Sequence, residues 1–100
     1  MPVSTTASDD GREVVIKVPG RFDFTCHQAF VGAYRAFPRG ETRFVVDLLG
    51  TEYMDSSALG MLLQLREYGD RSTRIALING ADGVQEILRI ANFDRLFEVA

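Results

Sequence analysis

Hydrophobic residues in the first half of the chain occur in two short runs with one helical pattern between them. Residues 13–18 read EVVIKV, a β-branched run of strand length that ends at a Pro-Gly turn signal. Residues 44–49 form a nearly continuous hydrophobic run, which predicts a strand buried on both faces. Between them we predict a helix capped by Thr25, with Gln28 completing a capping box. The helically spaced hydrophobic residues there are Ala29, Phe30, Ala33, Tyr34 and Phe37.

The second half of the chain predicts a β-α-β unit followed by a C-terminal helix. Residues 58–68 are hydrophobic at helical spacing and end at Gly69, and residues 74–78 predict another buried strand. The crossover between these strands should be right-handed and the strands parallel. Asp82 is expected to cap the next helix. Further hydrophobic residues at 93, 96 and 97 indicate a last helical turn and a short edge strand.

Together these elements predict a single α/β domain. At 100 residues the chain has enough length for one hydrophobic core. We expect a mixed central sheet of four to five strands packed with about three to four helices. Residues 1–12 are small, polar and acidic, so we predict a flexible lead-in there, and residues 13–100 are expected to form the domain.

Charge and composition exclude several functional classes. The formal net charge is −3, and the eleven basic residues are scattered, which disfavours binding to nucleic acid or to an anionic membrane. The longest apolar stretch, residues 58–65, is far shorter than the ~20 residues needed to span a bilayer. The single cysteine, Cys26, cannot form an intrachain disulfide, and the N-terminus lacks a signal-peptide layout. We therefore expect a cytoplasmic protein.

Two adjacent hydroxyls, Ser56 and Ser57, stand at the predicted start of the second helix. Asp and Ser are preferred helix N-caps, so the Asp55-Ser56-Ser57 triplet can simply begin the helix. A helix N-terminus also stabilises an added phosphate, because its N–H groups are unpaired and its dipole end is positive. The triplet is therefore either a cap or a modification site.

Winding the helix at about 100° per residue separates its two sides. Ser56 lies opposite the hydrophobic side, and Ser57 lies nearer the boundary. Gly60 leaves the backbone bare one turn below Ser56, which suits close approach by another protein. Leu59 and Leu63 flank the strip of helix surface formed by Ser56 and Gly60, either as core residues or as the apolar part of a contact surface. The expected hydrophobic side consists of Ala58, Met61, Leu62 and Leu65, and the opposite side also carries Gln64 and Glu67.

Three segments carry a family resemblance. MDSSALG at residues 54–60, GRFD at residues 20–23 and LRIANFDRLF at residues 88–97 resemble STAS domains, in particular bacterial anti-sigma factor antagonists. The resemblance covers roughly residues 13–99. It departs from the family at Ala58, where many relatives have glycine, and at Phe24, where some have a polar residue.

The resemblance implies a small single-domain STAS-like fold and a non-enzymatic phosphorylation switch. The unmodified domain would bind an anti-sigma factor or a histidine-kinase-like serine kinase and release a sigma factor. The kinase would phosphorylate the serine that follows the aspartate, here Ser56, and a PP2C-type phosphatase would restore it. The Asp23 loop would lie beside this serine at the partner surface, and Asp55 and Ser57 would frame the site.

Rival functions find less support in the residues. The only histidine, His27, has no nucleophile motif around it and projects about 100° away from Cys26 on a helix, so neither catalysis nor a shared metal is expected. No phosphate-binding glycine motif occurs, and we expect no cofactor. The scattered acids at 23, 47, 52 and 55 are better explained as turn and cap residues than as a cation site. The alternative that remains open is a STAS module that senses a small ligand or scaffolds a complex, with Ser56 never phosphorylated.

Overall fold

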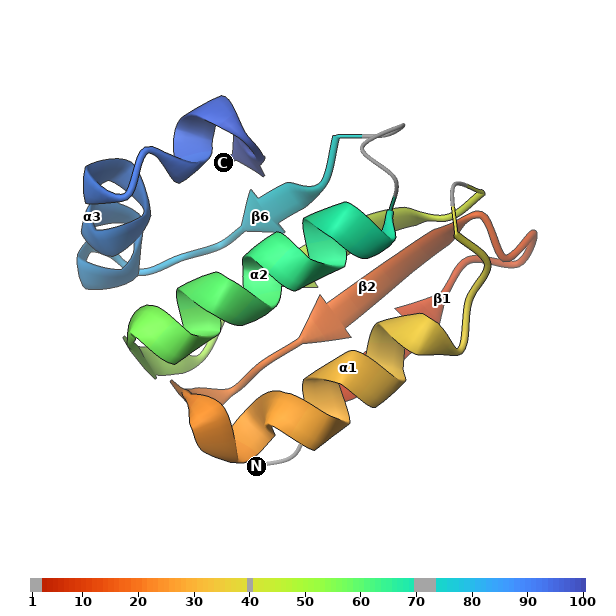
Figure 1. The fold of residues 1–100 in the computed structure, drawn as a ribbon, viewed down its shortest axis with the longest axis horizontal. Coiled ribbons are helices and arrows are strands. Elements are labelled where there is room, and N and C mark those ends of the chain that lie inside the picture. The colour runs from red at the N-terminus through yellow and green to blue at the C-terminus, as the bar shows by residue number, and fades with distance from the viewer. Residues whose placement is uncertain (1–2, 40, 70–73) are drawn as a thin grey trace.

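The computed structural model describes residues 3–39, 41–69 and 74–100, which form two sheets with helices packed on them (Figure 1). The larger sheet has, in spatial order, β1 (Ser4–Ala7), β2 (Glu13–Lys17), β4 (Arg43–Asp47), β6 (Ala76–Ile78) and β7 (Glu98–Val99). Only the β1–β2 pairing is antiparallel. The smaller sheet pairs β3 (Gly20–Phe22) with β5 (Thr51–Met54) in parallel. The helices are α1 (His27–Arg35), α2 (Ser56–Tyr68) and α3 (Asp82–Ile90), with 3-10 turns η1 (Phe24–Cys26) and η2 (Phe93–Arg95). The predicted α/β architecture is confirmed.

One hydrophobic core lies between the larger sheet and the helices. Figure 1 shows α1 and α2 lying side by side across one face of that sheet, while α3 lies beyond β6. On β2 the burial alternates as expected for a strand, since Val14 and Ile16 are buried and Lys17 is exposed. The buried residues of α2 are the four predicted from the helical pattern, Ala58, Met61, Leu62 and Leu65. The last helical turn and edge strand are also present, as η2 and β7.

The N-terminal segment differs from its expected flexible lead-in, because Ser4–Ala7 forms strand β1. All four of its residues are exposed, so no hydrophobic pattern marks the strand. Its backbone pairs with β2, and a polar turn connects the two strands. In that turn the Ser8 hydroxyl donates to Asp10 Oδ1 at 2.7 Å, and the Ser8 N–H donates to the Glu13 carbonyl at 2.8 Å. Backbone pairing therefore gives a regular structure to a segment for which the polar composition predicted none.

Two helix starts also differ from the prediction. Thr25 does not cap α1, because it lies within η1, whose cap is Asp23. The first residue of α1 is His27, and Cys26 precedes it without a side-chain capping bond. In α3, Asp82 is the first helical residue rather than the cap, so its carboxylate lies in the first turn, where the helix dipole favours it.

Candidate functional site

Strands β3 and β5 end side by side, and each is followed by an aspartate that caps the next helical element. Phe22 pairs with Met54 in the register of the two strands, and both side chains are buried. The next residues along each strand are therefore Asp23 and Asp55. Because the two strands are parallel, their carboxyl ends meet at the same edge of the small sheet. The two caps consequently lie together at one end of the molecule.

Asp55 holds the N-terminus of α2. Its Oδ1 accepts hydrogen bonds from the N–H groups of Ser57 at 3.0 Å and Ala58 at 3.2 Å. The Ser57 hydroxyl also donates to this oxygen, at 2.6 Å. Ser57 is half-buried, whereas Ser56 is exposed as the first residue of the helix, and its hydroxyl makes no hydrogen bond to the described residues. The two adjacent serines therefore differ: one is tied to the cap and the other is accessible.

Asp23 repeats this arrangement at the end of β3. Its Oδ1 accepts from the Thr25 N–H at 3.0 Å and from the Thr25 hydroxyl. Its Oδ2 accepts from Arg21 Nε at 3.2 Å. The residue between the aspartate and the hydroxyl residue is Phe24, 73% exposed, in the position that Ser56 occupies in the other cap. The site thus presents a large apolar side chain and a free hydroxyl at equivalent places.

Hydrogen bonds keep both aspartates ionised. The Ser57 hydroxyl, together with the N–H groups at the start of α2, lowers the pKa of Asp55. The Thr25 hydroxyl and N–H, with a smaller effect from Arg21, lower the pKa of Asp23. The negative charge of Asp23 acts in the opposite direction on the pKa of Asp55, which indicates that the two carboxylates are near neighbours. At neutral pH the exposed serine therefore stands beside two negative charges.

Below Ser56, the strip expected along α2 is present. Adding a Cβ at Gly60 would meet no atom within 4 Å, so the backbone there is open to approach. Leu63 is 39% exposed, whereas Leu59 is partly buried and packs against the core. The two leucines that flank the strip thus have different surroundings: Leu59 belongs to the edge of the core, and Leu63 lies on the surface.

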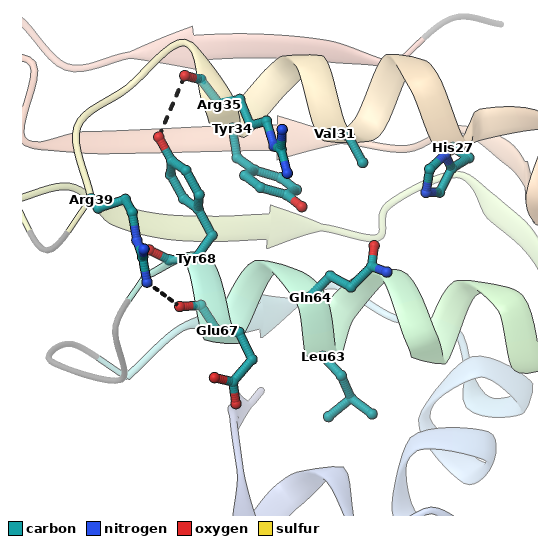
Figure 2. Close-up of a pocket in the computed structure, with 9 residues that line it drawn as sticks. All are labelled: His27, Val31, Tyr34, Arg35, Arg39, Leu63, Gln64, Glu67 and Tyr68. Atoms are coloured by element: carbon teal, nitrogen blue, oxygen red, sulfur yellow. Dashed lines mark hydrogen bonds between the residues drawn. The ribbon is translucent and has the colours of Figure 1, made fainter.

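A groove of about 700 Å³ runs between α1 and α2, next to this strip. Figure 2 shows its lining side chains: His27, Val31, Tyr34, Arg35, Arg39, Leu63, Gln64, Glu67 and Tyr68. His27 stacks on Phe24, with the ring centroids 5.8 Å apart, and this joins the groove to the Asp23 turn. The groove was not predicted from the sequence. The sequence signal for the groove is that positions 27, 31, 34 and 35 lie on one face of α1 and can therefore line a common surface.

The other residues considered for chemistry form structural hydrogen bonds or line the groove. Cys26 Sγ donates to the Arg21 carbonyl at 3.0 Å, while the His27 ring turns to the groove. Asp47 accepts from the Leu49 N–H and from Asn79 Nδ2, both at 3.0 Å. Within the described ranges, no group of three or more metal-ligating side chains comes together. The same part of the chain contains no helix with the length and hydropathy required to cross a membrane.

Comparisons with known proteins agree with this architecture. A family model described as "Mlab, STAS domain" matches residues 5–98. A STAS-domain-containing protein of Pseudomonas aeruginosa (strain UCBPP-PA14) is 45% identical over the whole of both chains. The structure of an anti-sigma factor antagonist from Mycobacterium paratuberculosis superposes with a TM-score of 0.76 at 19% identity, covering 97% of this chain and 84% of that one. The unphosphorylated anti-sigma factor antagonist SpoIIAA gives 0.64 at 16% identity, covering 93% and 96%. These structural likenesses concern the fold.

Proposed function

This chain belongs to the STAS-domain family, and we propose that within it the protein is an anti-sigma factor antagonist controlled by phosphorylation of Ser56. The unphosphorylated domain binds an anti-sigma factor that is also a histidine-kinase-like serine kinase, and so releases a sigma factor. The phosphorylated domain does not bind. The protein acts by changing partners in the cytoplasm, without a catalytic site or a cofactor of its own.

The observation that carries this proposal is the difference between the two serines. Ser57 donates its hydroxyl to Asp55 and is half-buried, so a kinase would have to break the cap to reach it. Ser56 is exposed at the N-terminus of a 13-residue helix, where the positive end of the helix dipole favours an added phosphate. The kinase transfers the γ-phosphoryl group of ATP to Ser56 Oγ, with release of ADP and the hydroxyl proton. A PP2C-type phosphatase reverses the modification by hydrolysis of the phosphoester, with release of inorganic phosphate.

Charge explains how the phosphate would exclude the partner. A phosphoserine adds about −1.5 to −2 charges at neutral pH. The phosphate would stand beside Asp23 and Asp55, both of which are already ionised. A partner whose acidic or apolar surface contacts Ser56 and the bare backbone at Gly60 would then face concentrated, strongly hydrated negative charge. The binding face is lost without any rearrangement inside the domain.

The test uses the domain and three variants as bait for proteins from the lysate of its own cells. Ser56→Ala should capture the anti-sigma partner constitutively, and Ser56→Asp should lose most of the captured protein. Thr6→Ala is the control: it removes an exposed hydroxyl on strand β1, away from the ends of β3 and β5, and should capture as the parent does. The captured protein is identified by mass spectrometry, and its kinase activity is assayed with ATP. Equal capture by the parent and Ser56→Asp would refute the switch.

Intact-mass measurement of the protein from its own cells separates this function from the remaining alternative. The proposal requires a fraction that is heavier by one phosphate under some growth condition, with the phosphate on Ser56. If no such fraction occurs under any condition, the domain is better explained as an unphosphorylated STAS module that senses a ligand or scaffolds a complex.

A further inference from the structure

The floor of the groove between α1 and α2 contains a buried polar group that the phosphorylation site does not use. The Tyr34 side chain is only 3% exposed, and Figure 2 shows its hydroxyl pointing into the groove. Apart from the neighbouring Arg35 guanidinium, no described residue provides this hydroxyl with a hydrogen-bond partner. Burial raises the pKa of Tyr34, so the hydroxyl keeps its proton and remains a donor. The hydroxyl is not left unsatisfied: it lies beside the Arg35 guanidinium, and its proton can be donated to a group that enters the groove.

The cation beside Tyr34 is also available, in contrast to the other arginine of the groove. Arg39 is held by the end of α2, where its Nε donates to the Tyr68 carbonyl at 2.9 Å and its Nη2 donates to the Glu67 carbonyl at 3.0 Å. Arg35 is exposed and forms no ion pair with a carboxylate of the described residues. In Figure 2 the Glu67 carboxylate points away from Arg35 and Tyr34. Arg35 and Tyr34 therefore present adjacent donors that suit a carboxylate.

Apolar surface lies along the groove from this donor pair toward Ser56. Val31 of α1 and Leu63 of α2 both line it. The Phe24–His27 stack continues the apolar surface to the Asp23 turn. From Ser56 to Tyr68, α2 extends roughly 18 Å, at about 1.5 Å per residue, so a neighbouring helix of about three turns matches its length. The groove is open to solvent along its length, which suits a polypeptide segment more than an enclosed small molecule.

We propose that this groove receives an amphipathic helix of the partner protein, with its apolar side chains against Val31 and Leu63 and an acidic side chain on Arg35 and Tyr34. The proposal rests on the proposed function in one respect: the same partner also contacts Ser56, which lies about two turns of α2 before Leu63 of the groove. It adds a second anchor in the groove, and it states the chemistry of the segment that docks. Helices commonly bind in this way, with apolar residues in a groove and charges at its rim.

Two synthetic peptides test the docking without requiring the cellular partner. Both are 16-residue helices built from the same leucines, alanines and glutamines, and they differ at one central position, which is Glu in one and Lys in the other. Backbone amide shifts are followed by NMR while each peptide is added to the intact domain. The Glu peptide should shift amides of α1 and α2 and bind about tenfold more tightly than the Lys peptide, as expected for one close charge pair.

Charge reversal at Arg35 tests whether this residue sets the preference for the Glu peptide. Arg35→Glu should reverse the preference, so that the Lys peptide binds better, and Tyr34→Phe should weaken the Glu peptide by about threefold through loss of one hydrogen bond. Arg12→Glu, on the exposed turn between β1 and β2, is the control and should change nothing. The inference is overturned if the shifts cluster at β1 or around Ile90, if Arg35→Glu leaves the preference unchanged, or if acetate alone reproduces the shifts at equal concentration. None of these outcomes alters the Ser56 capture result, so the two proposals fail separately.

Discussion

Replacing Gly60 by alanine should make the domain more stable and its partner binding weaker. Gly60 lies in the interior of α2, and a Cβ added there meets no atom within 4 Å, so alanine fits without strain. Glycine costs about 1 kcal/mol relative to alanine inside a helix, because its unfolded chain has more freedom to lose. For a domain of this size, about 1 kcal/mol raises the melting temperature by roughly 4–8 °C. The new methyl group covers the bare backbone one turn below Ser56, where the proposed partner approaches.

Gly32→Ala provides the matched control for this prediction. Gly32 lies inside α1, is exposed, and also has open space where a Cβ would go, but it does not line the groove. Both variants should therefore raise the melting temperature in a circular-dichroism melt, and only Gly60→Ala should capture less partner. A lower melting temperature for Gly60→Ala would refute the stability argument. Full capture by Gly60→Ala would show that the partner does not approach the backbone of α2 closely.

Three further changes test the arrangement around the site. Thr51→Val should lower the free energy of unfolding by about 1–3 kcal/mol in urea titration, because the buried Thr51 hydroxyl donates to a carbonyl in the β2–β3 connection. Asp55→Asn should lower the melting temperature at neutral pH, and the difference from the parent should shrink on acidification. The reason is that the pKa of Asp55 is lowered in the folded state. The ionised carboxylate therefore stabilises the fold above the ordinary carboxyl pKa, and this stability is lost as the pH falls through the lowered pKa. Asp23→Lys should weaken capture while the domain stays folded, and a melt without a cooperative transition would show that Asp23 is essential to the fold.

The sequence predicted the buried side of α2 well because four hydrophobic residues share that side of the helix. Ala58, Met61, Leu62 and Leu65 occupy one side, so packing them against the sheet turns the opposite side outward. The exposure of Ser56 follows from this orientation alone. The half-burial of Ser57 follows as well, since Ser57 lies 100° further around the helix.

The caps and the first strand depended on pairing between distant segments, which local patterns do not contain. Both Asp23 and Thr25 are good capping residues, and the choice between them is made by where β3 ends. That end is set by the register with β5, a strand that the sequence analysis did not predict. Strand β1 likewise carries no hydrophobic alternation and exists through its backbone pairing with β2. The groove required knowledge of how α1 and α2 lie beside each other, whereas periodicity describes each helix separately.

The paired ends of β3 and β5 suit the proposed switch at Ser56. Each strand delivers an aspartate to a helical N-terminus, and each aspartate uses the hydroxyl two residues later to complete its cap. In each cap, the residue between the aspartate and the hydroxyl residue makes no capping bond. This residue is Phe24 in one cap and Ser56 in the other. Because neither residue contributes a capping bond, either can change chemically without loosening its turn. Under the proposed function, a covalent change at Ser56 would abolish binding at this end while the core, the sheet and the groove between α1 and α2 keep their geometry.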